Sequence, residues 1–190
     1  MFEWNGFNWL QKGQNIDGIG YGDHFGGSVS ISGNGNTIAA GAIYTDINFA
    51  NSGSIKLFEF DGNIWNQVGQ QINGTSSDAN FGIDLSLNSI GNRVAAGASE
   101  WSNSGYVSIY QRVNDNWIET SNISGLNNQQ ANFGNAVSLN DNGNKVVVGA
   151  PKFDGLGYNR GLVAAYSVST PCSGCTDTNA YNYDPYALID

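Results

Sequence analysis

The stretch that decides the fold is DANFGIDLSLNSIGNRVAAGAS, residues 78–99, because the chain contains nearly the same sequence three times. The other two versions are GDHFGGSVSISGNGNTIAAGAI at residues 22–43 and QANFGNAVSLNDNGNKVVVGAP at residues 130–151. Their shared Phe-Gly pairs begin at Phe25, Phe81 and Phe133, so the period is 56 and then 52 residues. A fixed period of this length predicts an array of similar structural units.

Each unit is predicted to contain short strands joined by tight turns. The segments GGSVSIS (26–32), TIAAGA (37–42), GSIKLFEF (53–60) and IWNQVGQ (64–70) alternate apolar and polar residues or are rich in β-branched residues. Gly, Asn and Asp between them, as in NGN at 34–36 and DGN at 61–63, favour hairpin turns. Four-stranded antiparallel units of this size are typical of β-propeller blades, so we expect an all-β fold.

The repeated motifs resemble those of a known family. Phe133-Gly134 before one strand and Gly149-Ala150-Pro151 at the end of the next resemble FG-GAP repeats, the blades of integrin-α-type β-propellers. The resemblance covers residues 1–168. It implies a seven-bladed propeller with a recognition surface on one face, and calcium in Asp-rich hairpin loops between the first two strands of several blades.

The hairpin loops of this chain depart from the calcium-binding pattern of the family. The loops ISGNGNTI and LNSIGNRV contain no acidic residue, and LNDNGNKV offers only Asp141. Calcium requires about six to eight oxygen ligands, several of them carboxylate. We therefore expect plain hairpin turns there, and at most weak calcium binding in the tail, where the candidate ligands are Asp177, Asn179, Asn182 and Asp184. No other cofactor is expected.

The units divide the chain into expected domains. Residues 1–18 align with residues 57–74 and so are expected to be the end of a preceding blade. Residues 19–74 and 75–125 form complete blades, 126–168 an incomplete blade, and 169–190 a linker with a cysteine-containing tail. We expect part of a larger propeller, and the alternative is a small closed propeller completed by the N-terminal strand. The repeated position of Trp9, Trp65 and Trp117 predicts that these rings pack in the core or between blades.

The tail predicts the compartment. CTDTNAYNYDPYALID, residues 175–190, resembles the opening of a short module of large secreted bacterial proteins, which implies an extracellular or cell-surface location and a partner for Cys175 beyond residue 190. From the residues alone, Cys172 and Cys175 form either a local disulfide or two free thiols.

Composition excludes several classes of partner. Of the residues, 40% are hydrophobic and 12% charged, with a net charge of −9, so the chain has material for a core and no basic patch for nucleic acid. No apolar run approaches the ~20 residues of a membrane span, so no membrane insertion is expected.

Catalysis is not expected either. His24 is the only histidine, and beside Asp23 it has no visible third partner for a triad. Paired carboxylates among Asp23, Asp46, Asp78 and Asp154 leave a glycoside-active enzyme as a distant alternative.

A binding function is expected on the loops that join strand 2 to strand 3 and one blade to the next. Variable loops on a rigid scaffold commonly carry recognition, and exposed aromatic groups suit protein or glycan ligands. Packing between blades is the alternative for Tyr44, Phe153 and Trp101. We expect an adhesion or protein-interaction propeller, with a carbohydrate-binding propeller as the alternative, and the candidate binding face consists of Asp23, His24, Tyr44, Asp46, Asn80, Trp101, Asn132, Phe153, Asp154 and Tyr158.

Overall fold

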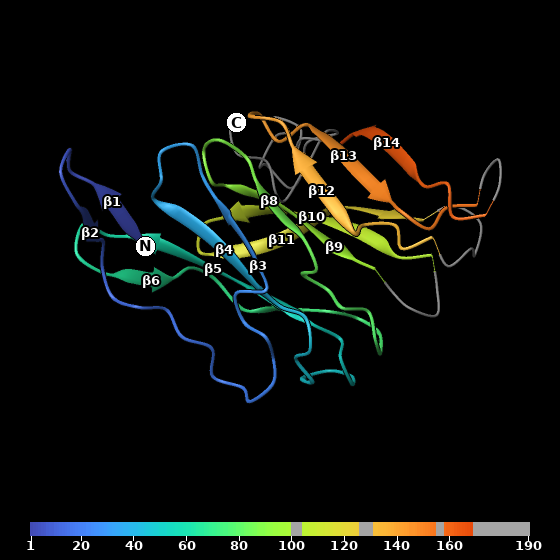
Figure 1. Ribbon diagram of the computed structural model, residues 1–190, viewed down its shortest axis with the longest axis horizontal. Helices are drawn as coiled ribbons and strands as arrows, with labels where there is room; N and C mark the ends of the chain where they lie inside the picture. The colour runs from blue at the N-terminus through green and yellow to red at the C-terminus, as the bar shows by residue number, and fades with distance from the viewer. Residues whose placement is uncertain (100–103, 126–130, 155–157, 169–190) are drawn as a thin grey trace, which may run out of the picture.

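The computed structural model describes residues 1–99, 104–125, 131–154 and 158–168, and over these residues the chain is all-β. The 14 strands of the described residues form separate antiparallel sheets that follow one another in chain order. Figure 1 shows these sheets side by side, with β1 and β2 at one end of the row and β14 at the other. The predicted all-β, propeller-like fold is confirmed.

Each sheet is a meander of consecutive strands. The N-terminal hairpin consists of β1 (Phe2–Trp4) and β2 (Trp9–Gln11). Blade 1 consists of β3 (Ser28–Ile31), β4 (Thr37–Ala42), β5 (Ser54–Phe60), β6 (Trp65–Gln67) and β7 (Ile72–Asn73). Blade 2 consists of β8 (Leu85–Leu87), β9 (Arg93–Ala98), β10 (Tyr106–Val113) and β11 (Asn116–Ser124). Blade 3 consists of β12 (Ala136–Leu139), β13 (Lys145–Ala150) and β14 (Leu162–Ser167).

Strand β7 is an element that the sequence pattern does not predict. It pairs with the beginning of β5, where Ile72 lies opposite Ile55, and Ile123 of β11 lies opposite Val107 in the same way in blade 2. The fourth strand is thus continuous in blade 2 but divided in blade 1. Gly69 causes the division, because its φ of +72° lies outside the range of a strand.

Apolar side chains of neighbouring blades form two similar cores. In the first core, Ile55 and Leu57 of blade 1 pack with Phe81, Leu85 and Leu87 of blade 2. The second core lies between blades 2 and 3 and contains Val107, Ile109, Phe133, Val137 and Leu139. These residues alternate along their strands, so blade 2 buries one face against blade 1 and the other against blade 3.

Hydrogen bonds between the first strands add to this packing. The backbone N–H of Leu87 donates to Ser30 Oγ, and that of Leu139 donates to Ser86 Oγ, both at 2.9 Å. The same serine position therefore joins blade 1 to blade 2 and blade 2 to blade 3.

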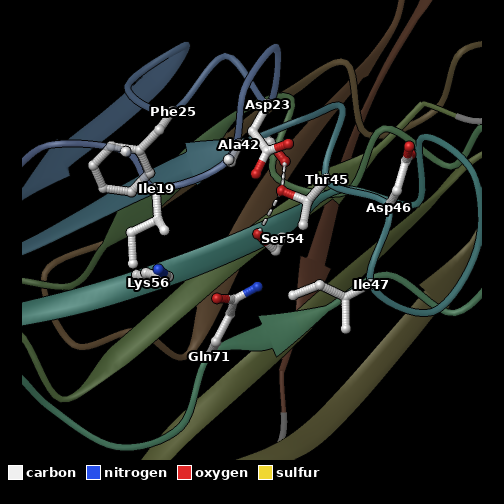
Figure 2. Close-up of a pocket in the computed structure, with 12 residues that line it drawn as sticks. Ile19, Asp23, Phe25, Ala42, Thr45, Asp46, Ile47, Ser54, Lys56 and Gln71 are labelled. Carbon is white, nitrogen blue, oxygen red and sulfur yellow. Dashed lines mark hydrogen bonds between the residues drawn. The ribbon is translucent and has the colours of Figure 1, made fainter.

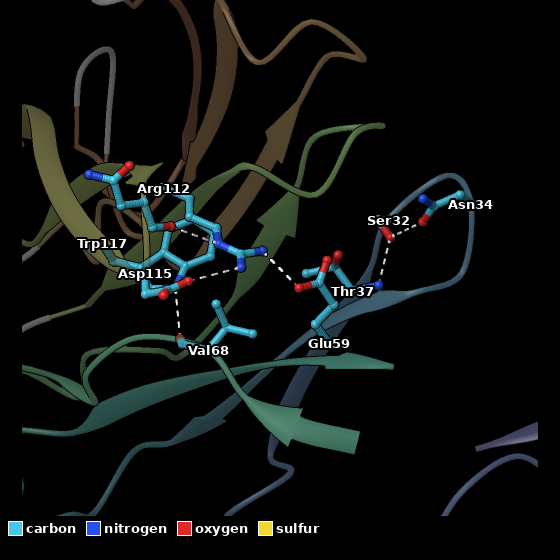
Figure 3. A network of polar contacts seen from close by, with 9 residues as sticks. Ser32, Asn34, Thr37, Glu59, Val68, Arg112, Asp115 and Trp117 are labelled. Atoms are coloured by element: carbon cyan, nitrogen blue, oxygen red, sulfur yellow. Dashed lines mark hydrogen bonds and ion pairs between the residues drawn. The ribbon is translucent and has the colours of Figure 1, made fainter. Parts of the chain in front are cut away.

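A tryptophan in the fourth strand joins each complete blade to the preceding unit, in an arrangement that we call the Trp lock. The buried Trp117 indole donates from Nε1 to the carbonyl oxygen of Val68 at 3.0 Å (Figure 3), and Trp65 Nε1 donates to that of Lys12 at 2.9 Å. Gln70 contacts both backbone groups of Trp117, since its amide donates to the carbonyl at 2.7 Å and its Oε1 accepts from the N–H at 3.1 Å.

Glycine is required on the receiving side of the Trp lock. A Cβ at Gly69 would lie 2.7 Å from Cδ1 of Trp117, and a Cβ at Gly13 would lie 2.7 Å from Cδ1 of Trp65. An ion pair beside the lock, Arg112 to Glu59 at 3.0 Å, also joins blades 1 and 2 (Figure 3).

Packing of Trp65 and Trp117 between units agrees with the sequence prediction.

The prediction for Trp9 is wrong. Its side chain is 66% exposed and contacts Trp4 of the same hairpin, with ring centroids 5.5 Å apart. The physical reason is that no described segment stands before Trp9 in the place that Lys12 and Gly13 occupy for Trp65. Repetition predicts the position of the ring, but burial depends on the presence of a neighbour.

Candidate functional site

The loop between β4 and β5 of blade 1, residues 43–53, forms one wall of the candidate site. Its ends are fixed by backbone bonds, from Thr45 N–H to the Ala42 carbonyl at 3.3 Å and from Gly53 N–H to the Thr45 carbonyl at 3.1 Å. Its middle is closed by the Asp46 carboxylate, which accepts from the N–H of Asn51 at 2.7 Å. Asn51 has a φ of +48°, a conformation that asparagine tolerates better than most residues.

The corresponding loop of blade 3 is closed in the same way. Asp154 Oδ1 accepts from the N–H of Asn159, which lies five residues later and has a φ of +50°. Asp46 and Asp154, both predicted for the binding face, therefore each use one carboxylate oxygen to hold their own loop. The spacing of Asp and Asn in the two loops is the sequence signal for this role.

The residue before each Phe-Gly pair lies in the left-handed region, with a φ of +54° at His24, +50° at Asn80 and +53° at Asn132. This backbone requirement accounts for asparagine in two of the three units. His24 is exposed, and its ring meets the edge of Tyr44 with centroids 4.8 Å apart. Tyr44 is thus held within blade 1 and not between blades.

A pocket of about 360 Å³ opens between this loop and the segment that enters blade 1 (Figure 2). Its walls carry Ile19 and Asp23 on one side and Asp46 and Ile47 on the other. Its floor is formed by strand residues, with Lys56 from β5 and Gln71 beside β7. Thr45, Ser54 and Phe25 also line the pocket.

Some polar groups of this pocket have hydrogen-bond partners within the protein, and others have none among the described residues. Thr45 Oγ1 donates to the Ala42 carbonyl at 2.9 Å and lies 3.0 Å from Ser54 Oγ, and both residues are buried. Among the described residues, by contrast, the carboxylate of Asp23 and the ammonium of Lys56 have no hydrogen-bond or ion-pair partner. The pocket therefore presents one anionic and one cationic group that are free to contact a ligand.

Lys56 and Gln71 are pocket residues that the sequence analysis missed. A lysine inside a strand was available as a signal, since the equivalent positions of the other blades hold Ser108 and Ala164. Ile19 and Ile47 were also missed, because isolated apolar residues in loops carry no pattern.

The structure brings only part of the predicted face together. Asp23, His24, Tyr44 and Asp46 lie around the pocket of blade 1. Asn80 is adjacent, since its N–H donates to the Asn51 carbonyl at 3.2 Å.

The remaining candidates belong to blade 3 and its entry segment. Phe153 packs against the second core, which supports the packing alternative for this ring, whereas Tyr158 is exposed. Asn132 precedes the Phe-Gly pair of this blade, and Trp101 lies outside the described residues.

The hairpin turns between first and second strands are closed by side-chain oxygens, of Ser32 in blade 1 and of asparagines in blades 2 and 3. Asn88 Oδ1 accepts from the N–H of Arg93, and Asn140 Oδ1 accepts from that of Lys145, both at 2.9 Å. Over the described ranges, no three His, Cys, Asp or Glu side chains are grouped so that they could hold a metal ion. The four tail residues predicted for weak calcium binding, and both cysteines with the module that contains them, lie outside the described residues.

The described part of the chain also contains no helix long and apolar enough to cross a membrane.

Comparisons with known proteins agree with the repeat and the fold. Residues 17–58 match the FG-GAP repeat, and no curated protein matches the chain. One similar solved structure is the complex of KlAtg21 with the coiled-coil of AgAtg16, at 12% identity and a TM-score of 0.54, covering 77% of this chain and 40% of that chain. Another is a protein from Bacteroides uniformis provisionally described as a 6-phosphogluconolactonase, at 16% identity and a TM-score of 0.53, covering 89% and 44%. At these identities the similarity shows the fold alone, and the chain spans less than half the length of either structure.

Proposed function

We propose that this chain is a non-catalytic binding module of an extracellular or cell-surface protein, and that it binds a protein ligand at the pocket of blade 1. The observation that carries the proposal is the pair of unpartnered charges, Asp23 and Lys56, in a pocket of about 360 Å³. An FG-GAP repeat at residues 17–58 supports the general function, because propellers of such repeats commonly serve as interaction modules.

The chemistry of the pocket favours a peptide over a sugar. Ile19 and Ile47 give its walls an aliphatic character, and opposite charges at Asp23 and Lys56 complement the backbone and charged side chains of a protein. Sugar rings pack best on flat aromatic faces, whereas the pocket lining has one aromatic residue, Phe25, whose ring packs edge-on with Phe58, and the Tyr44 ring lies against His24 outside the lining. Protein adhesion is therefore preferred to glycan binding.

The surroundings of His24 support a non-catalytic role. Its ring contacts Tyr44, and in the part of the chain that is described it makes no hydrogen bond to a carboxylate. A histidine base needs such a partner to fix its tautomer and orientation. The extracellular location rests on the sequence of residues 175–190, and accessibility of the full protein to protease on intact cells is its test.

The binding experiment compares capture of proteins from a cell-surface extract with binding to a glycan array. Asp23→Asn and Lys56→Gln each remove one free charge, and we expect each to weaken protein binding about tenfold or more. Asp141→Asn and Lys145→Gln are the matched controls, since both residues are exposed and lie away from the pocket. Glycan binding sensitive to the same two pocket variants would replace the protein ligand with a carbohydrate, and insensitivity to both would refute this site.

A further inference from the structure

Four Asn-Gly pairs occur in the chain, and the fold treats their backbone amides differently. The pairs begin at Asn5, Asn34, Asn73 and Asn142. In such a pair the backbone nitrogen of the glycine can attack Cγ of the asparagine side chain, because glycine has no Cβ to shield it. A glycine N–H that donates a hydrogen bond within the fold is held back from this reaction, since the bond must break before the nitrogen can lose its proton.

Three of the four glycines use their N–H in a backbone hydrogen bond of 2.8 or 2.9 Å. The donor and acceptor residues are Gly35 and Ser32, Gly74 and Gly53, and Gly143 and Asn140. Among the described residues, the N–H of Gly6 has no such partner. The nitrogen that follows Asn5 is therefore the one that is free to react.

The space around the glycines differs in the same direction. A Cβ at Gly6 would meet nothing within 4 Å, whereas a Cβ at Gly143 would lie 2.7 Å from Cδ of Arg93. The Gly143 carbonyl also accepts from Arg93 Nη1 at 2.6 Å, which fixes that peptide further. Asn34 and Asn142 are exposed like Asn5, so access of water alone does not distinguish the pairs.

The turn that contains Asn5 also activates its side chain. Asn5 Oδ1 accepts from the N–H of Phe7 at 2.9 Å and from the N–H of Asn8 at 2.8 Å. When a nitrogen attacks Cγ, negative charge develops on Oδ1, and donors already aimed at this oxygen stabilise it. Asn5 thus combines a free attacking nitrogen with a polarised carbonyl.

The equivalent turn of blade 1, residues 61–64, shows that the exposure belongs to the turn itself. Blade 1 has a described unit on either side, and this turn is nevertheless exposed. It has the same hydrogen bonds, since Asp61 Oδ1 accepts from the N–H of Asn63 at 2.8 Å and of Ile64 at 2.9 Å. An aspartate therefore fits the position that Asn5 occupies in the N-terminal hairpin.

We propose that Asn5 is a site of spontaneous deamidation in the folded protein. The Gly6 nitrogen forms a bond to Cγ of Asn5, the bond between Cγ and Nδ2 breaks, and Nδ2 leaves as ammonia with the proton of the Gly6 N–H. Water then opens the cyclic imide at one of its two carbonyl groups. One water is consumed and one ammonia released, and the product is aspartate or isoaspartate.

The two products affect the hairpin differently. Aspartate keeps the turn, as Asp61 does in blade 1. Isoaspartate passes the main chain through the side chain and so adds one main-chain carbon before Gly6. The lengthened turn no longer fits the register in which Trp4 lies opposite Trp9. Formation of isoaspartate should therefore weaken the pairing of β1 with β2.

The test is peptide mapping by mass spectrometry of the full chain, incubated in mildly alkaline buffer over several weeks. The peptide containing Asn5 is expected to gain the mass difference between an amide and a carboxyl group. Conversion at each of the other three pairs should be at least about tenfold slower, because a bonded glycine N–H must first leave its acceptor. The same incubation in concentrated urea removes the turn and the bonds, so all four pairs should then convert at similar rates.

A matched variant moves the reactive pair to a second place. Asp61→Asn creates a new Asn-Gly pair in the equivalent turn, where among the described residues the N–H of Gly62 is also without a partner. Residue 61 of this variant is expected to convert at a rate similar to that of Asn5. Asn5→Asp is the control for the product, and its far-ultraviolet circular dichroism should equal that of wild type.

Two results in the folded protein would overturn the proposal, namely conversion of Asn34 or Asn142 as fast as that of Asn5, and equally slow conversion of all four pairs. A ranking that persists unchanged in urea would also overturn it, because flanking residues and not the fold would then set the rates. A stable asparagine in Asp61→Asn would refute the role of the turn.

Discussion

The Trp lock gives a prediction with an internal control, because tryptophan occupies the same repeat position in two settings, buried against a neighbouring unit and exposed. Trp117 is 2% exposed and donates to the carbonyl oxygen of Val68, whereas Trp9 is 66% exposed. Substitution of either by alanine removes the same atoms from the same repeat position. We expect Trp117→Ala to destabilise the protein far more than Trp9→Ala.

The magnitudes follow from buried area. A fully buried tryptophan removes roughly 200 Å² from water, worth about 5 kcal/mol at about 25 cal/mol per Å² as an upper limit. Substitution of a buried Trp by Ala costs about 3–5 kcal/mol, so about 4 kcal/mol is expected for Trp117. Trp9 buries about a third of its surface, which gives at most about 1.5 kcal/mol, and its removal leaves no enclosed cavity. A cost of about 1 kcal/mol is expected for Trp9.

The measurement is urea unfolding followed by far-ultraviolet circular dichroism, with all samples at the same protein concentration. A difference of about 3 kcal/mol between the two variants in the free energy of unfolding supports the reasoning. Equal costs would refute it, because they would mean that burial of the ring at the lock does not determine its contribution.

Two further predictions concern the turns and the receiving side of the lock. Gly69→Ala should lower the free energy of unfolding by at least about 1 kcal/mol more than Gly22→Ala in the same assay. Both glycines have positive φ, but only a Cβ at position 69 would meet Trp117, at 2.7 Å from its Cδ1. Equal losses would show that the Trp117 ring moves freely. Hydrogen bonds from the backbone N–H groups of Ile64 and Asn63 lower the pKa of Asp61 below its ordinary value of 3.8. The folded protein then binds fewer protons there than the unfolded chain, so the stabilisation is present above pH 3.8 and is lost as the pH falls through the folded pKa. Asp61→Asn should therefore lose less stability than wild type in acid unfolding from pH 5 downward, and an identical acid profile would contradict this role.

Local and periodic features of the fold were predictable from the sequence. The strands, the hairpin turns and the packing of Trp65 and Trp117 follow from alternation, turn residues and a fixed period. The exposure of Trp9 was not predictable, because burial of the ring depends on a neighbour that the repeat alone does not supply. Strand β7 was missed because Gly69 interrupts the alternation just before it.

The candidate site was predictable only in outline. Asp23, His24, Tyr44 and Asp46 belong to segments that meet over blade 1, and their role in binding stays a prediction. Composition could not show that Asp46 closes its own loop, while the carboxylate of Asp23 stays free. That distinction depends on backbone geometry at Asn51, which no count of acidic residues reveals.

The receiving side of the Trp lock has a consequence for how such chains evolve. It consists of a main-chain carbonyl, a glycine and a glutamine (Gln14 or Gln70), so Lys12 and Val68 both supply the carbonyl despite their different side chains. A duplication or deletion of one unit in frame therefore creates a junction that already fits its neighbours, without compensating mutations on either side. Lineages that carry this lock can change the number of their units in a single genetic event, and selection can then act on the loops of each copy separately.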